Sequence, residues 1–242
     1  MIESTRAIVL HQIKYSDSGI IVQFFTSKYG RLSCLVRGFG NRKSGRNKAL
    51  FQPLSVLDLS FYYKDTREIH TIKDFSSVYS PVEIWSNIKK CSVAIFLGEV
   101  LTSVLREESP NEPLYQFIEN SVRYFNESGE SDANFHLAFM ARLTGFLGFE
   151  PAAEITGAKK YFDMLNGRFI NYPPEHRHFA NPEVSEILAA LFSSSPEKTK
   201  NIIMTGSRRN EVLDIIVNYF ALHLPGLKRI NSLEVLRQVF IL

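Results

Sequence analysis

The feature that most constrains this chain is a change in the spacing of its apolar residues at Ser80-Pro81. Before this point, short β-branched and aromatic runs alternate with turn residues, a pattern typical of strands. After it, apolar residues recur at helical spacing, and Pro81 suits the first turn of a helix. The sequence therefore predicts an α+β chain, with a strand-rich domain over residues 1–79 and a mainly α-helical domain over residues 80–242.

Five strand candidates precede this change, separated by turn residues such as those of Asp17-Ser18-Gly19. They are Ala7–Ile13, Ile20–Thr26, Leu32–Val36, Leu54–Tyr62 and Glu68–Ile72. Five short strands suit a small closed barrel, and the oligonucleotide-binding (OB) barrel has this number. An SH3-like barrel or a small sandwich fits the same pattern, so the spacing alone leaves these alternatives open.

The second part of the chain contains an apolar stripe from Val82 to Arg106, a helix opening at Pro113 and another from about Asp132 to Leu147. Three later segments carry helix start signals. They are Asn181-Pro182-Glu183, Ser195-Pro196-Glu197 and Asn231-Ser232-Leu233-Glu234. One interruption is expected near residues 157–171, where Asn166-Gly167 signals a hairpin with a two-residue turn.

Positive charge is concentrated in the first 80 residues. They contain 12 Lys and Arg against 6 Asp and Glu, a balance of +6, whereas the remainder carries −3 of the overall +3. Such asymmetry indicates a polyanionic partner for the basic part, although a solvated face also produces some of it.

The strongest local feature is a basic run inside an acid-free segment that extends from Asp17 to Asp58. The run consists of Lys28, Arg31, Arg37, Arg42, Lys43, Arg46 and Lys48. Its Gly/Ser-rich part, residues 38–46, can approach a phosphate backbone closely, so we interpret the run as a nucleic-acid contact.

Aromatic residues near the run offer faces on which unpaired bases can stack. The candidates are Phe24, Phe25, Tyr29, Phe39 and Phe51. Most are expected to belong to the core, and Phe39, inside the glycine-rich segment, is the preferred stacking residue.

The sequence gives little support for a catalytic site or a metal site. The chain has no P-loop motif, and the basic region lacks the clustered carboxylates of a metal-dependent nuclease. His176 and His178 lie in a polar segment without a convincing third ligand, so we expect no metal site and no cofactor. Cys34 and Cys91 lie among apolar neighbours and are expected to be buried thiols.

The chain begins without a signal-peptide pattern and has no apolar stretch near the 18 to 20 residues of a membrane-spanning helix. We therefore expect a cytoplasmic protein that makes no membrane contact.

Short motifs follow one another along nearly the whole chain. They are Arg6-Ala7-Ile8-Val9-Leu10, Tyr15-Ser16-Asp17-Ser18, Phe25-Thr26-Ser27-Lys28-Tyr29-Gly30-Arg31, Val36-Arg37-Gly38-Phe39, Lys43-Ser44, Phe51-Gln52-Pro53-Leu54, Leu97-Gly98-Glu99-Val100-Leu101, Leu147-Gly148-Phe149-Glu150-Pro151 and Ser232-Leu233-Glu234-Val235-Leu236. In this order the set resembles the RecO family of DNA repair and recombination mediators. Each motif is weak alone, and their order makes the set fairly specific.

The resemblance implies a non-catalytic protein that binds and anneals single-stranded DNA, cooperates with RecR, engages the single-stranded DNA-binding protein SSB, and helps load RecA. It also implies DNA contacts at Arg37, Arg42 and Lys43, which the charge pattern selects as well. Many RecO proteins carry a four-cysteine zinc module after the Gly-Phe-x-Pro segment. This chain has no cysteine beyond Cys91, so zinc binding is not carried over.

The family docks the acidic, apolar C-terminal tail of SSB on the helical domain, a task that needs a cation beside an apolar groove. Arg142, on the same helix as Phe139, has this chemistry, and Arg123 is a second candidate. Two other functions stay open. The barrel of a protein-interaction or RNA-binding adaptor fits the same sequence, and a nuclease is the more distant alternative.

Overall fold

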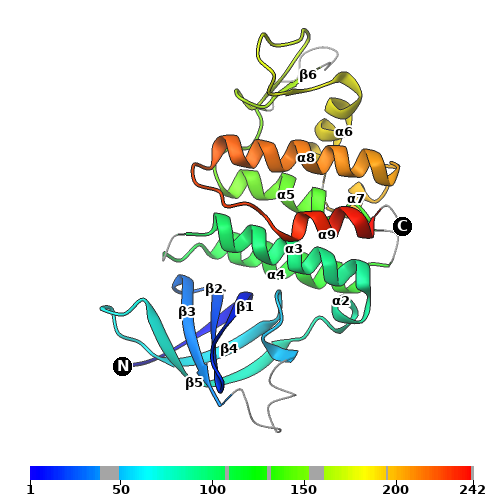
Figure 1. Ribbon diagram of the computed structural model, residues 1–242. Helices are drawn as coiled ribbons and strands as arrows, with labels where there is room; N and C mark the ends of the chain where they lie inside the picture. The colour runs from blue at the N-terminus through cyan, green and yellow to red at the C-terminus, as the bar shows by residue number, and fades with distance from the viewer. Residues whose placement is uncertain (39–48, 107–108, 130–131, 153–160, 195, 241–242) are drawn as a thin grey trace. The chain divides into compact units, whose positions relative to one another are not determined.

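The computed structural model describes the chain from residue 1 to residue 240, except residues 39–48, 107–108, 130–131, 153–160 and 195 (Figure 1). It contains two compact units. The first comprises Met1–Glu127 with Ile230–Leu236, and the second comprises Ser128–Arg229 with Arg237–Leu242. The domain boundary expected after residue 79 remains a prediction, because the first compact unit includes helices as well as the strand-rich part.

The strand-rich part is a closed five-stranded barrel, which confirms the predicted fold class (Figure 1). The strands are β1 (Ile2–Ser16), β2 (Gly19–Thr26), β3 (Gly30–Arg37), β4 (Val56–Tyr62) and β5 (Ile69–Tyr79), in the order β1-β2-β3-β5-β4. The barrel closes because β1 is long: Ile2–Ile8 pair with β4, and residues from Ala7 onward pair with β2. This two-sided pairing explains why β1 exceeds the predicted Ala7–Ile13.

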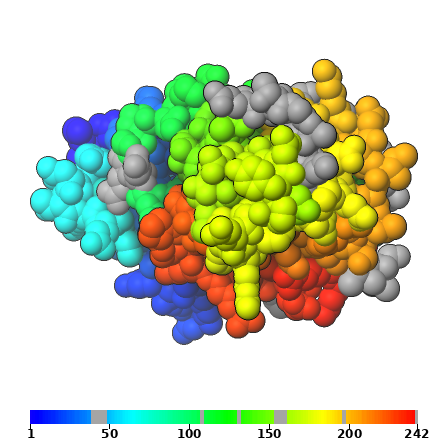
Figure 2. Space-filling view, turned by 90° about the horizontal axis from the view of Figure 1, so that it is seen from above, coloured from blue at the N-terminus to red at the C-terminus, as the bar shows by residue number. Residues whose placement is uncertain are grey.

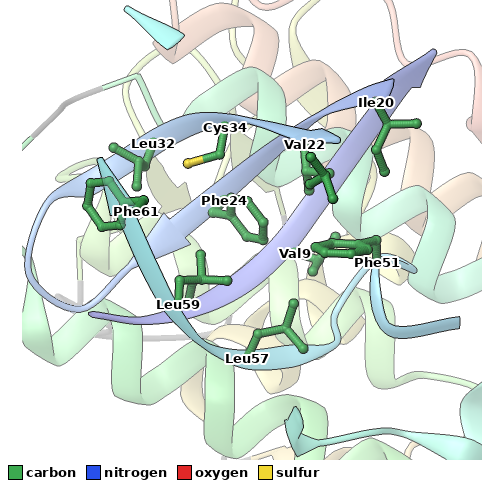
Figure 3. Packing of buried hydrophobic residues seen from close by; sticks show 12 residues of the cluster. Val9, Ile20, Val22, Phe24, Leu32, Cys34, Phe51, Leu57, Leu59 and Phe61 are labelled. Carbon is green, nitrogen blue, oxygen red and sulfur yellow. The ribbon is translucent and has the colours of Figure 1, made fainter. Parts of the chain in front are cut away.

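The interior of the barrel is filled by alternate residues of each strand, as the two-residue period of a strand requires. Val22, Phe24 and Cys34 are fully buried in this cluster, together with Phe51 from the segment before β4 (Figure 3). The Phe51 ring packs edge-on against Phe24 and Phe75, with centroid distances of 6.4 and 4.8 Å. The neighbouring residues on each strand face outward, among them Arg31 and Arg37 of β3.

Three helices follow the barrel within the first unit: α2 (Val82–Ser86), α3 (Ile88–Val104) and α4 (Glu112–Glu127). The stripe predicted from Val82 to Arg106 is divided at Asn87, whose backbone is extended and whose side chain accepts hydrogen bonds from the first amides of α3. Helix α3 approaches the barrel closely at Gly98. A Cβ atom there would lie 2.7 Å from the Leu10 carbonyl oxygen and 3.1 Å from the Pro53 Cβ.

Two charged side chains of α3 form hydrogen bonds that stabilise the first unit. The buried Lys90 ammonium donates to the carbonyl oxygens of Phe125 and Asn126, at 2.9 and 3.1 Å, and so caps the C-terminal turn of α4. The Glu99 carboxylate accepts hydrogen bonds from the backbone and side chain of both Asn231 and Ser232, at the start of α9 (Ser232–Val239). Burial raises the pKa of Glu99, but these hydrogen bonds outweigh it, and the net pKa is lowered.

The second unit is mainly helical, as predicted. It contains α5 (Phe135–Phe146), α6 (Pro182–Ser193), the short α7 (Pro196–Thr199) and α8 (Gly206–His223). The start signals at Asn181 and Pro196 are confirmed, and the Asn181 side chain caps α6 by accepting from the Val184 amide. Helix α8 was not predicted, although Thr205 caps it and its apolar residues recur at helical spacing.

A small three-stranded sheet interrupts these helices where the hairpin was expected; its residues gather on the face seen in Figure 2. Strand β6 (Tyr161–Asp163) lies between β7 (Arg168–Ile170) and β8 (Phe179–Ala180). The predicted two-residue turn is wrong, because Asp163 pairs with Arg168 and leaves a four-residue loop. The buried Asp163 carboxylate stabilises this loop by accepting from the amides of residues 165 and 166 and from the Asn166 side chain.

A fully buried histidine on α5 should make the stability of the second unit depend on pH. Burial and the nearby Arg209 lower the pKa of His136 to about 3, and its ring stacks on Phe240 at 5.1 Å. The unfolded chain takes up a proton near pH 6.5, whereas the folded protein does not until about pH 3, so stability falls as the pH falls through this window. The expected slope from this residue is about 1.4 kcal/mol per pH unit between pH 6 and pH 4.

Replacing His136 by Phe, which retains a ring for Phe240, should remove that part of the slope. Urea denaturation of both proteins at pH 7, 6, 5 and 4 measures it. Parallel stability curves for the two proteins would show that His136 does not contribute to the acid sensitivity.

Candidate nucleic-acid interface

The structure separates the predicted basic residues into two groups at opposite ends of β3. Arg37 is the last residue of this strand, whereas Lys28 lies in the turn before it and Arg31 near its start. Eight residues of extended strand place the two ends about 20 Å apart. The three described residues of the basic run therefore do not form one continuous patch, and we consider each end of β3 by itself.

At the C-terminal end of β3, Arg37 is exposed and makes no ion pair with any residue that the structure describes. Pairing places it beside Gly19 of β2, which in turn pairs with Ser16 of β1. The following Gly38 has a φ of +76°, a conformation that favours glycine, and it leads directly into the glycine-rich segment. A free guanidinium at a strand end is well suited to contact phosphate.

The other predicted contacts of this end lie outside the described residues. They are Phe39, Arg42, Lys43, Arg46 and Lys48. The segment that holds them starts after Gly38 and ends before Ala49, so it is joined to β3 next to Arg37. In sequence, this segment contains four basic residues and no acid.

The other end of β3 has a mixed charge. Lys28 is exposed, but it lines a cleft of about 720 Å³ between the outer surface of the barrel and α4. The charged residues of this cleft are Arg6, Lys28, Asp58, Glu112 and Glu119. With three acids beside two bases, the lining of the cleft has no excess of positive charge to attract a polyanion.

Arg31 has a structural contact that the sequence did not indicate. Its guanidinium donates to the carbonyl oxygen of Leu105 at 3.4 Å, and Leu105 directly follows the last residue of α3. A cation at a helix C-terminus stabilises the carbonyls there. This contact lowers the rank of Arg31 as a DNA contact relative to Arg37.

The aromatic residues weighed for base stacking are mostly in the core. Phe24, Phe25 and Phe51 are at most 2% exposed, so their faces cannot meet a base. Tyr29 is half-buried and donates to Glu3 at 2.8 Å; burial and this carboxylate raise its pKa to about 12. Phe39 lies outside the described residues, and none of the other four candidates offers an exposed ring.

Sequence reasoning missed the tip of the β1–β2 hairpin. Tyr15 is 63% exposed there and Ile13 is 47% exposed, and Lys14 forms a surface ion pair with Asp17 at 3.8 Å. The sequence contained a usable indication, because an aromatic residue just before the turn at Asp17-Ser18-Gly19 is expected to be exposed. Tyr15 was not considered because it lies far in sequence from the basic run. Strand pairing is what brings this tip next to Arg37.

The three candidate residues for docking the SSB tail differ in exposure and in their contacts. Arg142 on α5 is exposed and faces Glu150 at 3.6 Å, whereas Phe139 on the same helix is 2% exposed and belongs to the core. Arg123, in the first unit, pairs with Glu119 at 2.7 Å and lies 4.4 Å above the Tyr79 ring. Of these three side chains, Arg142 is the one most available to a partner.

No group of three potential metal ligands occurs within the described residues. His176 contacts the buried Asp163 at 3.2 Å, which ties this histidine to the loop after β6. Cys34 is buried in the barrel, where burial raises the pKa of its thiol to about 12. No helix in the described ranges is both long and apolar enough to cross a membrane.

Comparison with known proteins agrees with the fold. Residues 1–81 match the family described as the N terminal of recombination protein O, and residues 86–234 match its C-terminal counterpart. The chain is 37% identical to the DNA repair protein RecO of Phocaeicola vulgatus, 35% to that of Azobacteroides pseudotrichonymphae and 33% to that of Porphyromonas gingivalis. Each match covers 99% of this chain and 100% of the relative.

A closed barrel followed by helices, with matches of this extent, defines a DNA repair protein. The chain belongs to the RecO family.

Proposed function

We propose that this protein binds single-stranded DNA at the Arg37 end of its barrel and acts as a recombination mediator. The observation that carries the proposal is the exposed Arg37, which makes no ion pair with a described residue and closely precedes four basic residues between 39 and 48, a stretch without an acid. OB barrels use one face and its adjoining loops to bind oligonucleotides. Because the contacts are to phosphates, binding should be strongly salt-dependent and show little sequence preference.

The rest of the mediator role is proposed from family membership. It comprises annealing of complementary strands, cooperation with RecR, and assistance in loading RecA onto SSB-coated DNA, all in the cytoplasm and without catalysis. The exposed Arg142 supports a docking site for the acidic SSB tail on α5. The core position of Phe139 means that a groove there would need other apolar side chains.

Two single substitutions test the location of the DNA site. Arg37→Ala should weaken binding of a fluorescent single-stranded oligonucleotide about three- to tenfold and lower the slope of log K against log salt by about 0.7, one phosphate contact. Lys28→Ala is the matched control, since Lys28 is an exposed cation at the other end of the same strand. It should leave both quantities nearly unchanged.

Equal losses in the two variants would place the site elsewhere or show that only net charge matters. Absence of any DNA binding by the native protein would favour a protein-interaction adaptor. Release of shortened strands on adding a divalent metal would favour a nuclease.

A further inference from the structure

An exposed aromatic ring lies beside the proposed phosphate contact. Tyr15 is 63% exposed on the part of β1 that extends beyond the barrel core, where every residue from Ile13 to Ser18 is exposed. The pairing of β1 with β2 is irregular between Lys14 and Ser16, so Tyr15 is the extra residue of a bulge. Bulges redirect side chains and are frequent next to functional sites.

The strand register fixes the distance between Tyr15 and Arg37. Ser16 of β1 pairs with Gly19 of β2, and Gly19 pairs with Arg37 of β3. Two strand spacings separate Ser16 from Arg37, so the backbone positions of Tyr15 and Arg37 lie on the order of 10 Å apart. Both side chains are long, and one oligonucleotide strand can contact both.

We propose that Tyr15 is a base-stacking residue that makes this end of the barrel selective for single strands. The inference rests on the proposed DNA-binding function and names the source of its selectivity. An arginine contacts phosphates of single and double strands alike, whereas a tyrosine face needs an unstacked base. Phe24, Phe25 and Phe51 are buried in the described structure and offer no face to a base, whereas the Tyr15 ring does.

The barrel provides a matched control. Tyr62 is 51% exposed at the end of β4, where it pairs with Ile2 at the start of β1, and therefore lies at the other end of the barrel. Removing the Tyr62 ring takes away an exposed aromatic face from the same unit without touching the Arg37 end. Tyr15→Phe is the conservative variant, because it keeps the stacking face and removes only the hydroxyl.

The experiment compares the native chain, Tyr15→Ala, Tyr15→Phe and Tyr62→Ala on three probes of equal length. The probes are a single-stranded oligonucleotide, the same strand with abasic positions, and the duplex. On the normal strand, Tyr15→Ala should bind about tenfold more weakly, Tyr15→Phe and Tyr62→Ala should bind like the native chain, and the salt slope should not change. On the abasic strand and the duplex, the difference between Tyr15→Ala and the native chain should disappear.

A Tyr15→Ala variant that binds the normal strand within twofold of the native chain, while Arg37→Ala weakens it, would overturn the stacking role and leave the proposed function intact. A loss of equal size on the abasic strand would also overturn it, because no base is then involved. Failure of the native chain to bind any probe would instead overturn the proposed function. Circular dichroism shows whether each variant is folded.

Discussion

Replacing Gly98 by valine is expected to lower the free energy of unfolding by about 3 kcal/mol, among the largest effects of any single substitution in this chain. The added Cβ would lie 2.7 Å from the Leu10 carbonyl oxygen and 3.1 Å from the Pro53 Cβ. Neither is the end of a flexible side chain, so the contact can be relieved only if α3 moves away from the barrel. Urea denaturation followed by circular dichroism measures the loss.

The matched control for Gly98 is Gly145 on α5. A Cβ there would meet the carboxylate of the exposed Glu150 at 3.2 Å, and this side chain can move away. Gly145→Ala should therefore change stability by less than about 1 kcal/mol, since the gain in helix propensity offsets a small adjustment. Stability of Gly98→Val equal to that of the native chain would contradict the close packing of α3 on β1.

Replacing Arg37, Arg42 and Lys43 together by alanine is expected to have the largest effect on DNA binding. Three charge-assisted phosphate contacts would be lost, which should weaken binding about 100-fold or more and lower the salt slope by about 2. Protein stability should change little, because Arg37 is exposed and makes no described ion pair.

The control for this triple variant removes the same net charge from the other end of the barrel. Lys28, Lys64 and Arg67 are all exposed there, in the β2–β3 turn and the segment between β4 and β5. Their joint replacement by alanine should weaken binding several-fold at most, through the general field of the protein. An equal loss in both triple variants would indicate that net charge, rather than a site at Arg37, determines binding.

The barrel could be predicted from sequence because strand periodicity is local. Along β3, buried residues alternate with less buried ones, and the five predicted strands overlap the five observed ones. The ends of β1 could not be predicted, because its length depends on pairing with both β2 and β4. The contact of Gly98 with Leu10 joins residues far apart in the chain, so no local pattern reveals it.

The candidate site was only partly predictable, because it also depends on contacts between residues that are far apart in the sequence. The acid-free basic run identified Arg37, but sequence proximity also grouped it with Lys28, which the strand places at the other end. Proximity also made Phe24, Phe25 and Phe51 candidates for stacking, but most of the aromatic residues near the run were expected to belong to the core, where these three lie. Tyr15 was missed because only the register of three strands brings it beside Arg37.

The most direct test of the central claim is a titration of a fluorescent single-stranded oligonucleotide at several salt concentrations, without metal or nucleotide. It compares the native chain with the triple variant at Arg37, Arg42 and Lys43. Tight, salt-sensitive binding by the native chain and its loss in the variant is the predicted result. No binding by the native chain even at low salt would contradict the claim that the basic end of this barrel binds DNA.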